Sequence, residues 1–410
     1  MNGEASSAPH ASAAALVSGP DHEPRQTWRP ERCERVALVL QGGGALGAYQ
    51  AGVYEALHEA RIEPDWVSGV SIGAIFGAHR RQPPGAAPRA AAHLLGAHHR
   101  AQDLGLHARW RRVPQLTPSL GQPGFFARRF PGPWLSLAGA RDATSYYDTA
   151  PLRQTLRELV DFDLLNSGGV RFSVGAVNVL TGNFVYFDNA DGAIEPEHVM
   201  ASGALPPSLP MVKIGTDHFW DGGIVSNTPL QHLLEQEDNL NALVFQVDLF
   251  SARGTLPRDI EDVMARHKDI MYSSRTRYNT DVFKRLHNWK AQLHRALVKV
   301  PADQLTEEEW QPRDELAHQP EITILHLIYQ QKAYEGHAKD HESSGTSMRE
   351  HWQSGYEDTK RSLKRLDWLA LPPLGSGKHG ALLAASSPLG ACPPGGTEAG
   401  CQQGPGPPTR

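Results

Sequence analysis

The sequence contains little cysteine and no excess of positive charge. Its three cysteines, Cys33, Cys392 and Cys401, show no spacing typical of metal ligands. An odd, sparse set argues against a disulfide framework and is typical of a reducing compartment. The net charge at pH 7 is −5, so no cationic surplus offers a face to phosphates. We therefore expect neither disulfides nor nucleic-acid binding.

Long hydrophobic runs are missing as well. No stretch is apolar for long enough to span a bilayer. The N-terminus has no basic start and only a short apolar run at residues 13–17, so it does not predict a signal peptide. We expect a cytoplasmic protein, whose contact with a membrane would be peripheral.

The first ordered part of the chain has the pattern of a βαβ unit. Residues 36–40 form a β-branched and aliphatic run that predicts a buried strand. Residues 41–47 are rich in glycine, and residues 48–60 carry apolar side chains at helical spacing. Residues 65–70 predict a second strand, followed by another helix. This succession implies a parallel sheet with a right-handed crossover.

The rest of the chain predicts a mixed α/β domain between two disordered ends. Residues 1–30 are rich in Ala, Ser, Pro and charge, and residues beyond 372 are rich in Gly and Pro, so we expect no fold there. We expect helices at 151–160, 195–204, 260–300 and 347–366, and strands at 172–179, 184–187, 212–214, 218–220, 242–249 and 322–328.

A glycine loop stands between the first strand and the first helix. Gly42, Gly43, Gly44 and Gly47 let the backbone turn tightly and leave N–H groups at the positive end of a helix dipole. Such a loop stabilises an anion, either a bound phosphate or the oxyanion of an acyl-transfer intermediate. Gly42, Gly44 and Gly47 also match the dinucleotide fingerprint GxGxxG, and a plain tight turn is the third interpretation.

The end of the second strand distinguishes these interpretations. A dinucleotide-binding unit places an acid there for the ribose, whereas the nearby acids, Glu63 and Asp65, precede this strand. The strand instead ends in GVSIG, a GxSxG nucleophile elbow between a strand and a helix. Gly69 and Gly73 are small because the sharp turn brings strand and helix close together. The strain would present the hydroxyl of Ser71, the candidate nucleophile.

The run Asp221-Gly222-Gly223 follows a predicted hairpin and, taken alone, is typical of a turn. A serine hydroxyl is a poor nucleophile unless a base takes its proton. An aspartate can do this when its surroundings are dry enough to raise its pKa. Asp221 is therefore the candidate base, and Asp217, in a Gly-Thr-Asp sequence, is interpreted as a turn residue.

Other candidate groups lack a recognisable context. A conventional triad needs a histidine after the acid, and His232, His267 and His287 qualify by order alone. We interpret each as a surface or helix residue. The acids Asp188, Asp191 and Glu195 are spaced like loop residues, so they predict no metal site.

The segments QGGGALGAYQAG, GVSIGA and DGGIVSNTPL, in this order, resemble the patatin-like phospholipases. The similarity runs from about Arg35 to Trp368, and the segments YYDTAPLRQTL, VMASGALPPSLP, FQVDLFSARG and HLIYQQKAYEGHAKD resemble a bacterial subgroup. The resemblance implies a three-layer α/β/α fold with a mostly parallel sheet, and a Ser–Asp dyad without a catalytic histidine. It assigns Ser71 as nucleophile, Asp221 as proton acceptor, and the backbone of Gly42, Gly43 and Gly44 as the oxyanion hole.

The resemblance also implies a domain organisation and a reaction. Residues 35–250 would form the patatin-like catalytic domain, and residues 251–370 a mainly helical C-terminal extension packed on it. Residues 1–34 and 371–410 would be disordered. The reaction would be hydrolysis of a carboxylic ester of a lipid or phospholipid through an acyl-serine intermediate, with no cofactor and no metal.

Two features depart from the family pattern. Leu46 stands where many members carry a basic residue, which removes a charge near the oxyanion. Residues 79–102 are dominated by residues with GC-rich codons where the fold needs a regular helix. We hypothesise that this stretch is translated out of frame, because a one-base shift with permissible codons yields a peptide with helical periodicity. Coding DNA whose codons cannot yield that peptide would contradict the hypothesis.

Three functions follow from these observations. The leading one is a lipid acyl hydrolase. The second is a catalytically inactive patatin-like scaffold that binds lipid or protein, which the two departures favour. The third, a nicotinamide- or flavin-binding module, is disfavoured by the missing acid. We interpret the basic residues in 275–299 as a solvated helix face, with anionic lipid headgroups as the alternative contact, and residues 114–133 as a candidate lid.

Overall fold

The computed structural model describes residues 27–79, 121–372 and 383–384, apart from gaps at 237, 239, 302–303, 307, 309–315, 317–319, 333–334, 337–338 and 343. The segments expected to be disordered, 1–34 and 371–410, lie largely outside the described residues. The stretch at 79–102 that we suspect of being out of frame lies outside them too, except for the backbone of His79 at the end of a helix.

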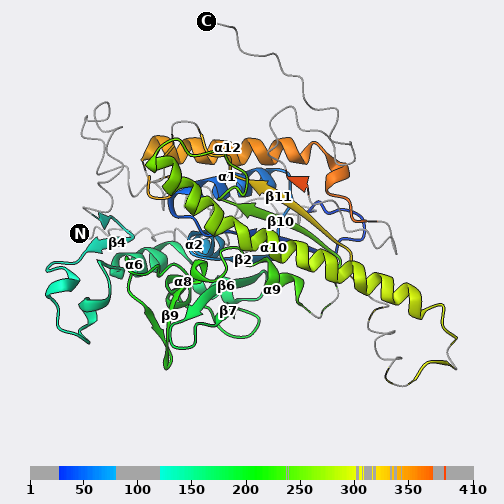
Figure 1. Ribbon diagram of the computed structural model, residues 1–410, viewed down its shortest axis with the longest axis horizontal. Coiled ribbons are helices and arrows are strands. Elements are labelled where there is room, and N and C mark those ends of the chain that lie inside the picture. Colours follow the sequence, from blue (N-terminus) through cyan, green and yellow to red (C-terminus); the bar gives the residue numbers. More distant parts are fainter. Residues whose placement is uncertain are drawn as a thin grey trace, which may run out of the picture.

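A nine-stranded sheet forms the centre of the molecule (Figure 1). Its strands lie in the order β12-β11-β10-β1-β2-β6-β9-β8, and β7 also pairs with β6. The sheet is parallel from β12 to β6 and antiparallel where β7, β8 and β9 join it. The bounds are β1 Arg35–Leu40, β2 Trp66–Gly69, β6 Arg171–Asn178, β7 Phe184–Asp188, β8 Val212–Ile214, β9 Asp217–Asp221, β10 Ala242–Asp248, β11 Ile322–Ile328 and β12 Leu383–Ala384.

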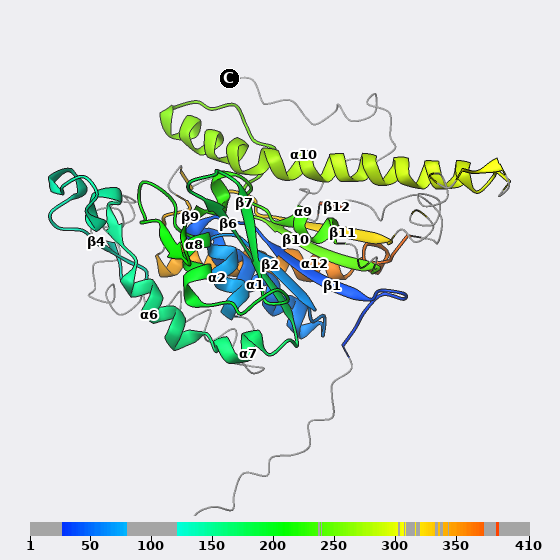
Figure 2. The same ribbon diagram turned by 90° about the horizontal axis from the view of Figure 1, so that it is seen from below.

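Helices cover both faces of this sheet. The helix α1 (Gly47–Glu59) packs on one face with α12 (Gly345–Leu363) against it, and α10 (Ile260–Leu297) and α9 (Leu230–Leu234) lie on the other. Figure 2 shows α10 running along the whole length of the sheet and beyond it. The remaining helices are α2 Ile72–His79, α6 Ala150–Leu159, α7 Phe162–Asn166 and α8 Pro196–Ser202. These layers confirm the predicted α/β/α architecture.

The alternation of side chains along β1 explains the two cores. Val36, Leu38 and Leu40 are buried in the larger core, which includes α1, whereas Ala37 and Val39 are buried in the smaller core under α9 and α10. Successive side chains of a strand point to opposite faces. A run of five apolar residues is therefore what a strand covered on both faces requires.

Two glycines allow α1 and α12 to cross closely. A Cβ atom on Gly52 would lie 1.9 Å from the carbonyl oxygen of Trp352, and one on Gly355 would lie 2.0 Å from that of Tyr49. Any larger residue would therefore have to push the two helix backbones apart. This contact fixes the C-terminal part of the chain to the first helix of the fold.

The C-terminal region is more than a helical layer. Residues 251–370, expected as a mainly helical extension, also supply β11, which pairs with β10 over seven residues inside the central sheet. The strand at 322–328 was predicted, but its position depends on pairing between segments far apart in the sequence. Among the described helices, none combines the length and the apolar character needed to cross a bilayer.

Candidate active site

Three loops meet where the central parallel strands end. Leu40 of β1 lies beside Gly69 of β2 and Val247 of β10. The glycine loop, the elbow and the segment after β10 therefore leave the sheet at the same edge. The chain continues from β1 towards β2 on one side and β10 lies on the other, so this edge is a switch point, where open α/β sheets bind ligands.

Ser71 sits in a strained turn at this edge. Its φ angle is +54°, in the left-handed region that side chains other than glycine rarely adopt. A Cβ atom on Gly69 would lie 2.4 Å from the carbonyl oxygen of Gly73, and one on Gly73 would lie 2.4 Å from that of Leu40. Glycine at both positions is what lets β2, the turn and α2 approach one another.

Ser202, at the end of α8, supports this turn. Its buried hydroxyl accepts a hydrogen bond from the Ser71 backbone N–H at 2.9 Å and donates one to the Gly175 carbonyl at 2.6 Å. The next residue, Gly203, is also close, because a Cβ atom there would lie 3.8 Å from Ser71 Oγ. The end of α8 thus lies beside the serine, which the elbow motif alone does not predict.

The carboxyl group of Asp221 is fully buried beside Ser71. It accepts hydrogen bonds from the Gly223 N–H at 2.7 Å and from the Ser71 hydroxyl. Burial raises the pKa of Asp221 to about 7, against the opposing effect of these two donors. Gly222 packs on β6, where a Cβ atom would lie 2.6 Å from the Gly175 carbonyl oxygen. An aspartate held in this way can accept a proton near neutral pH.

The glycine loop is held by residues from distant segments. The Gly42 N–H donates to the backbone oxygen of Asn227 at 3.1 Å, and the Asn227 amide donates to the Gly42 oxygen at 2.9 Å. Gly44 has a φ of +55°, and a Cβ atom there would lie 2.2 Å from the Asp340 carbonyl oxygen. That oxygen accepts the Ala45 N–H at 2.9 Å. The Gly42 amide therefore donates within the fold rather than into the site.

Reciprocal ion pairs fix the segment around Asp340 to α10. Lys268 lies 2.7 Å from the Asp340 carboxylate, and Lys339 lies 2.6 Å from that of Asp269. Two Lys-Asp dipeptides thus exchange partners, and the Lys339 ammonium is almost completely buried. The C-terminal half of the chain braces the glycine loop through this connection.

The phenol of Tyr272, on α10, also lies near the carboxyl group. Burial raises its pKa, and the charges of Asp221 and Asp340 raise it further. Its ring packs on Phe250 with centroids 4.9 Å apart. Leu46, which stands where a basic residue was expected, is fully buried in the larger core. The physical cause of the raised pKa of Asp221 is its burial, since the two hydrogen bonds that it accepts lower the pKa.

The histidines that sequence order allowed lie elsewhere. His232 stacks on Tyr186 and lies 3.2 Å from Asp188, at the opposite end of β6 from the pairing with Asp221. His267 is exposed on α10, and the ring of His287 contacts Phe283. In the described part of the chain, the donors that act on the Asp221 carboxyl are an amide and a hydroxyl rather than an imidazole.

The acidic residues that the sequence placed in loops and turns lie away from the site. Asp188 is bound by Arg171, Ser173 and His232 in a buried network. Asp217 begins β9 and pairs with Ile214 across a tight hairpin. Within the described residues, no group of histidines, cysteines and acids has the geometry of a metal site.

Ser202, Asn227 and Asp340 were not predicted as site residues. Each lies in a segment whose similarity to the family was noted, VMASGALPPSLP, DGGIVSNTPL or HLIYQQKAYEGHAKD. Similarity of those segments was the only available signal. Their roles depend on which distant loop each one meets.

Two family profiles match the chain over most of its described length. One, described as patatin-like phospholipase, matches residues 38–234, and another, described as patatin phospholipase, matches residues 270–374. The chain belongs to the patatin-like phospholipase family. The two matches include the glycine loop, Ser71, Ser202, Asp221, Asn227 and Asp340.

Two curated relatives of this patatin-like chain are fungal and animal enzymes of much greater length. It is 24% identical to the lysophospholipase NTE1 of Yarrowia lipolytica over 233 residues, which are 57% of this chain and 14% of that protein. It is 56% identical to the neuropathy target esterase sws of Drosophila melanogaster over 43 residues, which are 10% of this chain and 3% of that protein. The chain thus spans about one seventh of the fungal relative.

Two solved structures are also similar to the patatin-like chain. VipD from Legionella pneumophila matches with a TM-score of 0.32 and 14% identity, over 85% of this chain and 72% of that one. Human GIVD cytosolic phospholipase A2 matches with a TM-score of 0.31 and 14% identity, over 52% of this chain and 42% of that one.

Proposed function

We propose that this protein is a serine lipid acyl hydrolase of the phospholipase A or esterase type. The observation that carries the proposal is the buried Asp221 carboxyl, with a pKa of about 7, accepting a hydrogen bond from Ser71 in its strained turn. A base whose pKa lies near the working pH takes a proton most efficiently. Membership of the patatin-like phospholipase family supports a lipid ester as the substrate.

In the proposed mechanism, Asp221 takes the proton of the Ser71 hydroxyl as Ser71 Oγ attacks the ester carbonyl. A tetrahedral intermediate forms with a negative oxygen. The C–O bond to the alcohol then breaks, and the leaving alkoxide takes the proton from Asp221. Water, deprotonated by Asp221, attacks the acyl-serine in turn, and the released Ser71 recovers its proton. The carboxylic acid leaves, and the site returns to its starting state.

The glycine loop would stabilise the negative oxygen of both intermediates. Of the three amides assigned to the oxyanion hole, that of Gly42 donates to Asn227. We therefore propose that Gly43 and Gly44 supply the donors, while Gly42 anchors the loop. Their backbone is held in place before the reaction, so no reorganisation is needed when the charge develops.

Labelling with a fluorophosphonate tests the proposal. The wild-type protein should be labelled and should hydrolyse a short p-nitrophenyl ester and a phospholipid. Ser71→Ala should lose labelling and turnover, and Asp221→Asn should lose most turnover because the hydroxyl keeps its proton. A folded wild-type protein that takes no label would instead support an inactive patatin-like scaffold, which the apolar Leu46 favours.

A further inference from the structure

A small lobe beside the site carries large apolar side chains that face solvent. It comprises residues 121–148, and its core is the antiparallel sheet of β3 (Gly121–Gln122), β4 (Phe126–Arg128) and β5 (Tyr147–Asp148). Figure 1 shows it projecting from one end of the molecule, next to α6. At its tip, Phe130 is 99% exposed, Trp134 85%, Leu135 79% and Leu137 84%. Clusters of this kind on a soluble surface mark interaction sites.

The tip is presented by a built scaffold. Arg129 donates to the Ser145 hydroxyl and to the Tyr147 carbonyl, both at 3.1 Å, and pairs with Asp142. These bonds close the base of the loop that carries the four apolar side chains. Thr155 of α6 also donates to the Gly124 carbonyl at 2.6 Å. The base of the loop is therefore fixed both within the lobe and to α6.

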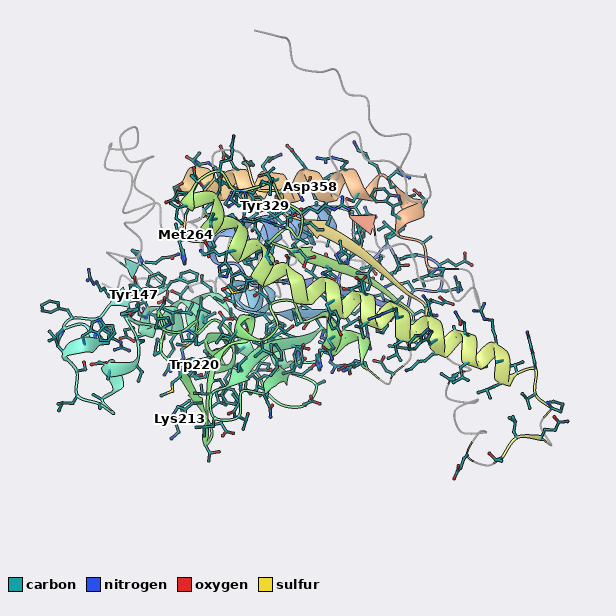
Figure 3. All side chains as sticks on the ribbon, in the orientation of Figure 1. Tyr147, Lys213, Trp220, Met264, Tyr329 and Asp358 are labelled. Atoms are coloured by element: carbon teal, nitrogen blue, oxygen red, sulfur yellow. The ribbon has the colours of Figure 1, made fainter. Side chains whose placement is uncertain are left out.

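The lobe is connected to the proposed catalytic serine through one short segment. The N–H groups of Tyr146 and Tyr147 donate to the carbonyls of Pro207 and Ser208, at 3.2 and 3.0 Å. That segment follows Gly203, which borders Ser71 Oγ. Figure 3 labels Tyr147 at the junction of the lobe and the body. The lobe is therefore bonded to the segment that follows Gly203, the neighbour of the proposed nucleophile.

The charge of the tip differs from that of the whole chain. Residues 121–148 contain three arginines against two aspartates, whereas the whole chain has a net charge of −5, and Arg129 is already paired with Asp142. Arg128 is exposed, and with Trp134 and Tyr146 it lines a cavity of about 330 Å³ at the base of the tip. Arginine is suited to phosphate, and tryptophan and tyrosine are suited to the boundary between headgroups and acyl chains.

We propose that this lobe is an interfacial anchor for an anionic phospholipid surface. Phe130, Trp134, Leu135 and Leu137 enter the boundary of the acyl chains, and Arg128 faces the headgroup phosphates. The inference rests on the proposed lipid hydrolase function and adds to it the surface by which the protein reaches its substrate. The hydrogen bonds at the base of the loop hold its ends together before it meets a surface, which lowers the ordering cost of the backbone there.

Vesicle binding in the Ser71→Ala background tests the anchor without hydrolysis of the vesicles. Flotation with phosphatidylcholine vesicles, with and without phosphatidylserine, should show binding that phosphatidylserine strengthens. Phe130→Ala with Trp134→Ala should weaken binding by roughly a hundredfold, since each aromatic side chain contributes about tenfold or more when buried. Arg128→Gln should reduce mainly the effect of phosphatidylserine. Trp289→Ala is the matched control, because Trp289 is an exposed tryptophan on α10.

Quenching of tryptophan fluorescence by brominated lipids gives a second measurement, for which a single conservative change, Trp134→Phe, is sufficient. The brominated lipids should quench part of the tryptophan fluorescence of the Ser71→Ala protein, and Trp134→Phe should remove that part. The anchor is refuted if vesicles do not bind, if the tip variants bind as before, or if Trp289→Ala is the variant that loses binding. It is also refuted if light scattering shows a dimer that the tip variants turn into a monomer.

The two proposals fail separately in these experiments. A wild-type protein that takes no fluorophosphonate but binds vesicles through Trp134 refutes only the hydrolase. A protein that takes the label, while its Ser71→Ala form does not bind vesicles, refutes only the anchor.

Discussion

The protonation of Asp221 should control the rate of the proposed reaction. With a pKa of about 7, the carboxyl group is mostly neutral below that pH and cannot accept the serine proton. For a short soluble ester, kcat/KM should rise with pH and level off above about pH 8. At pH 5, two units below the pKa, only about one site in a hundred is ionised, so kcat/KM should be about a hundredfold lower than on the plateau.

The same pKa makes a prediction for stability. In the unfolded chain an aspartate titrates near 3.8, so between about pH 4 and 7 the native state keeps a proton that the unfolded chain releases. The free energy of unfolding therefore falls as the pH rises through this range. A rise from 3.8 to about 7 corresponds to about 4 kcal/mol, at 1.36 kcal/mol for each pH unit. Asp221→Asn has no charge to bury and escapes this loss.

Urea unfolding of the wild type and of Asp221→Asn, at pH 4.5 and at pH 8, measures the effect. Between the two conditions the variant should gain about 3 kcal/mol of stability relative to the wild type, because pH 4.5 already lies above 3.8, and it should lose turnover. Asp217→Asn removes a partly exposed aspartate from the same strand and controls for the lost charge. A rate that is constant from pH 5 to 8, or equal stability differences at both pH values, would refute the reasoning.

Three further predictions concern the supports of the site. Ser202→Ala leaves the N–H of Ser71, the proposed nucleophile, without its partner. The value of kcat should then fall more than KM changes, and the unfolding free energy should fall by roughly 1–3 kcal/mol; an unchanged kcat would show that the elbow keeps its geometry without Ser202. Gly52→Ala forces a Cβ atom against the Trp352 carbonyl and should lower the unfolding free energy by about 1–3 kcal/mol or more, measured in urea. Lys339→Met leaves the buried Asp269 carboxylate unpaired and should lower the unfolding free energy by about 3–5 kcal/mol. A second change, Asp269→Leu, should largely restore it. Additive losses in that double variant would contradict the ion-pair account.

Local patterns in the sequence were sufficient for the elements near the site. The apolar run of β1 and the strand-turn-helix character of the elbow depend on residues that are neighbours along the chain. Their ends were predicted within one or two residues, because glycine and proline stand at the ends of the apolar runs there. The hairpin of β8 and β9, which ends at Asp221, was recognised for the same reason.

The order of the strands could not be predicted in the same way. Strands β10 and β11 were recognised as buried, but their place beside β1 results from pairing across long stretches of chain. Two parallel strands are joined by a long crossover rather than by a tight turn, so no turn sequence between them indicates that they pair. The strand at 322–328 was predicted within a C-terminal extension, and its pairing with β10 was not, because nothing local identifies the partner of a parallel strand.

The sequence by itself determined which groups could do the chemistry: a serine in an elbow, a glycine loop and an aspartate in a turn. These assignments depend on short motifs whose geometry is local. Only the tertiary structure decided that the Asp221 carboxyl is dry, that Gly42 donates to Asn227, and that Ser202 and Asp340 support the elbow and the loop. Burial and hydrogen-bond partners are properties of the packed chain, since each depends on which distant residues arrive at the same place.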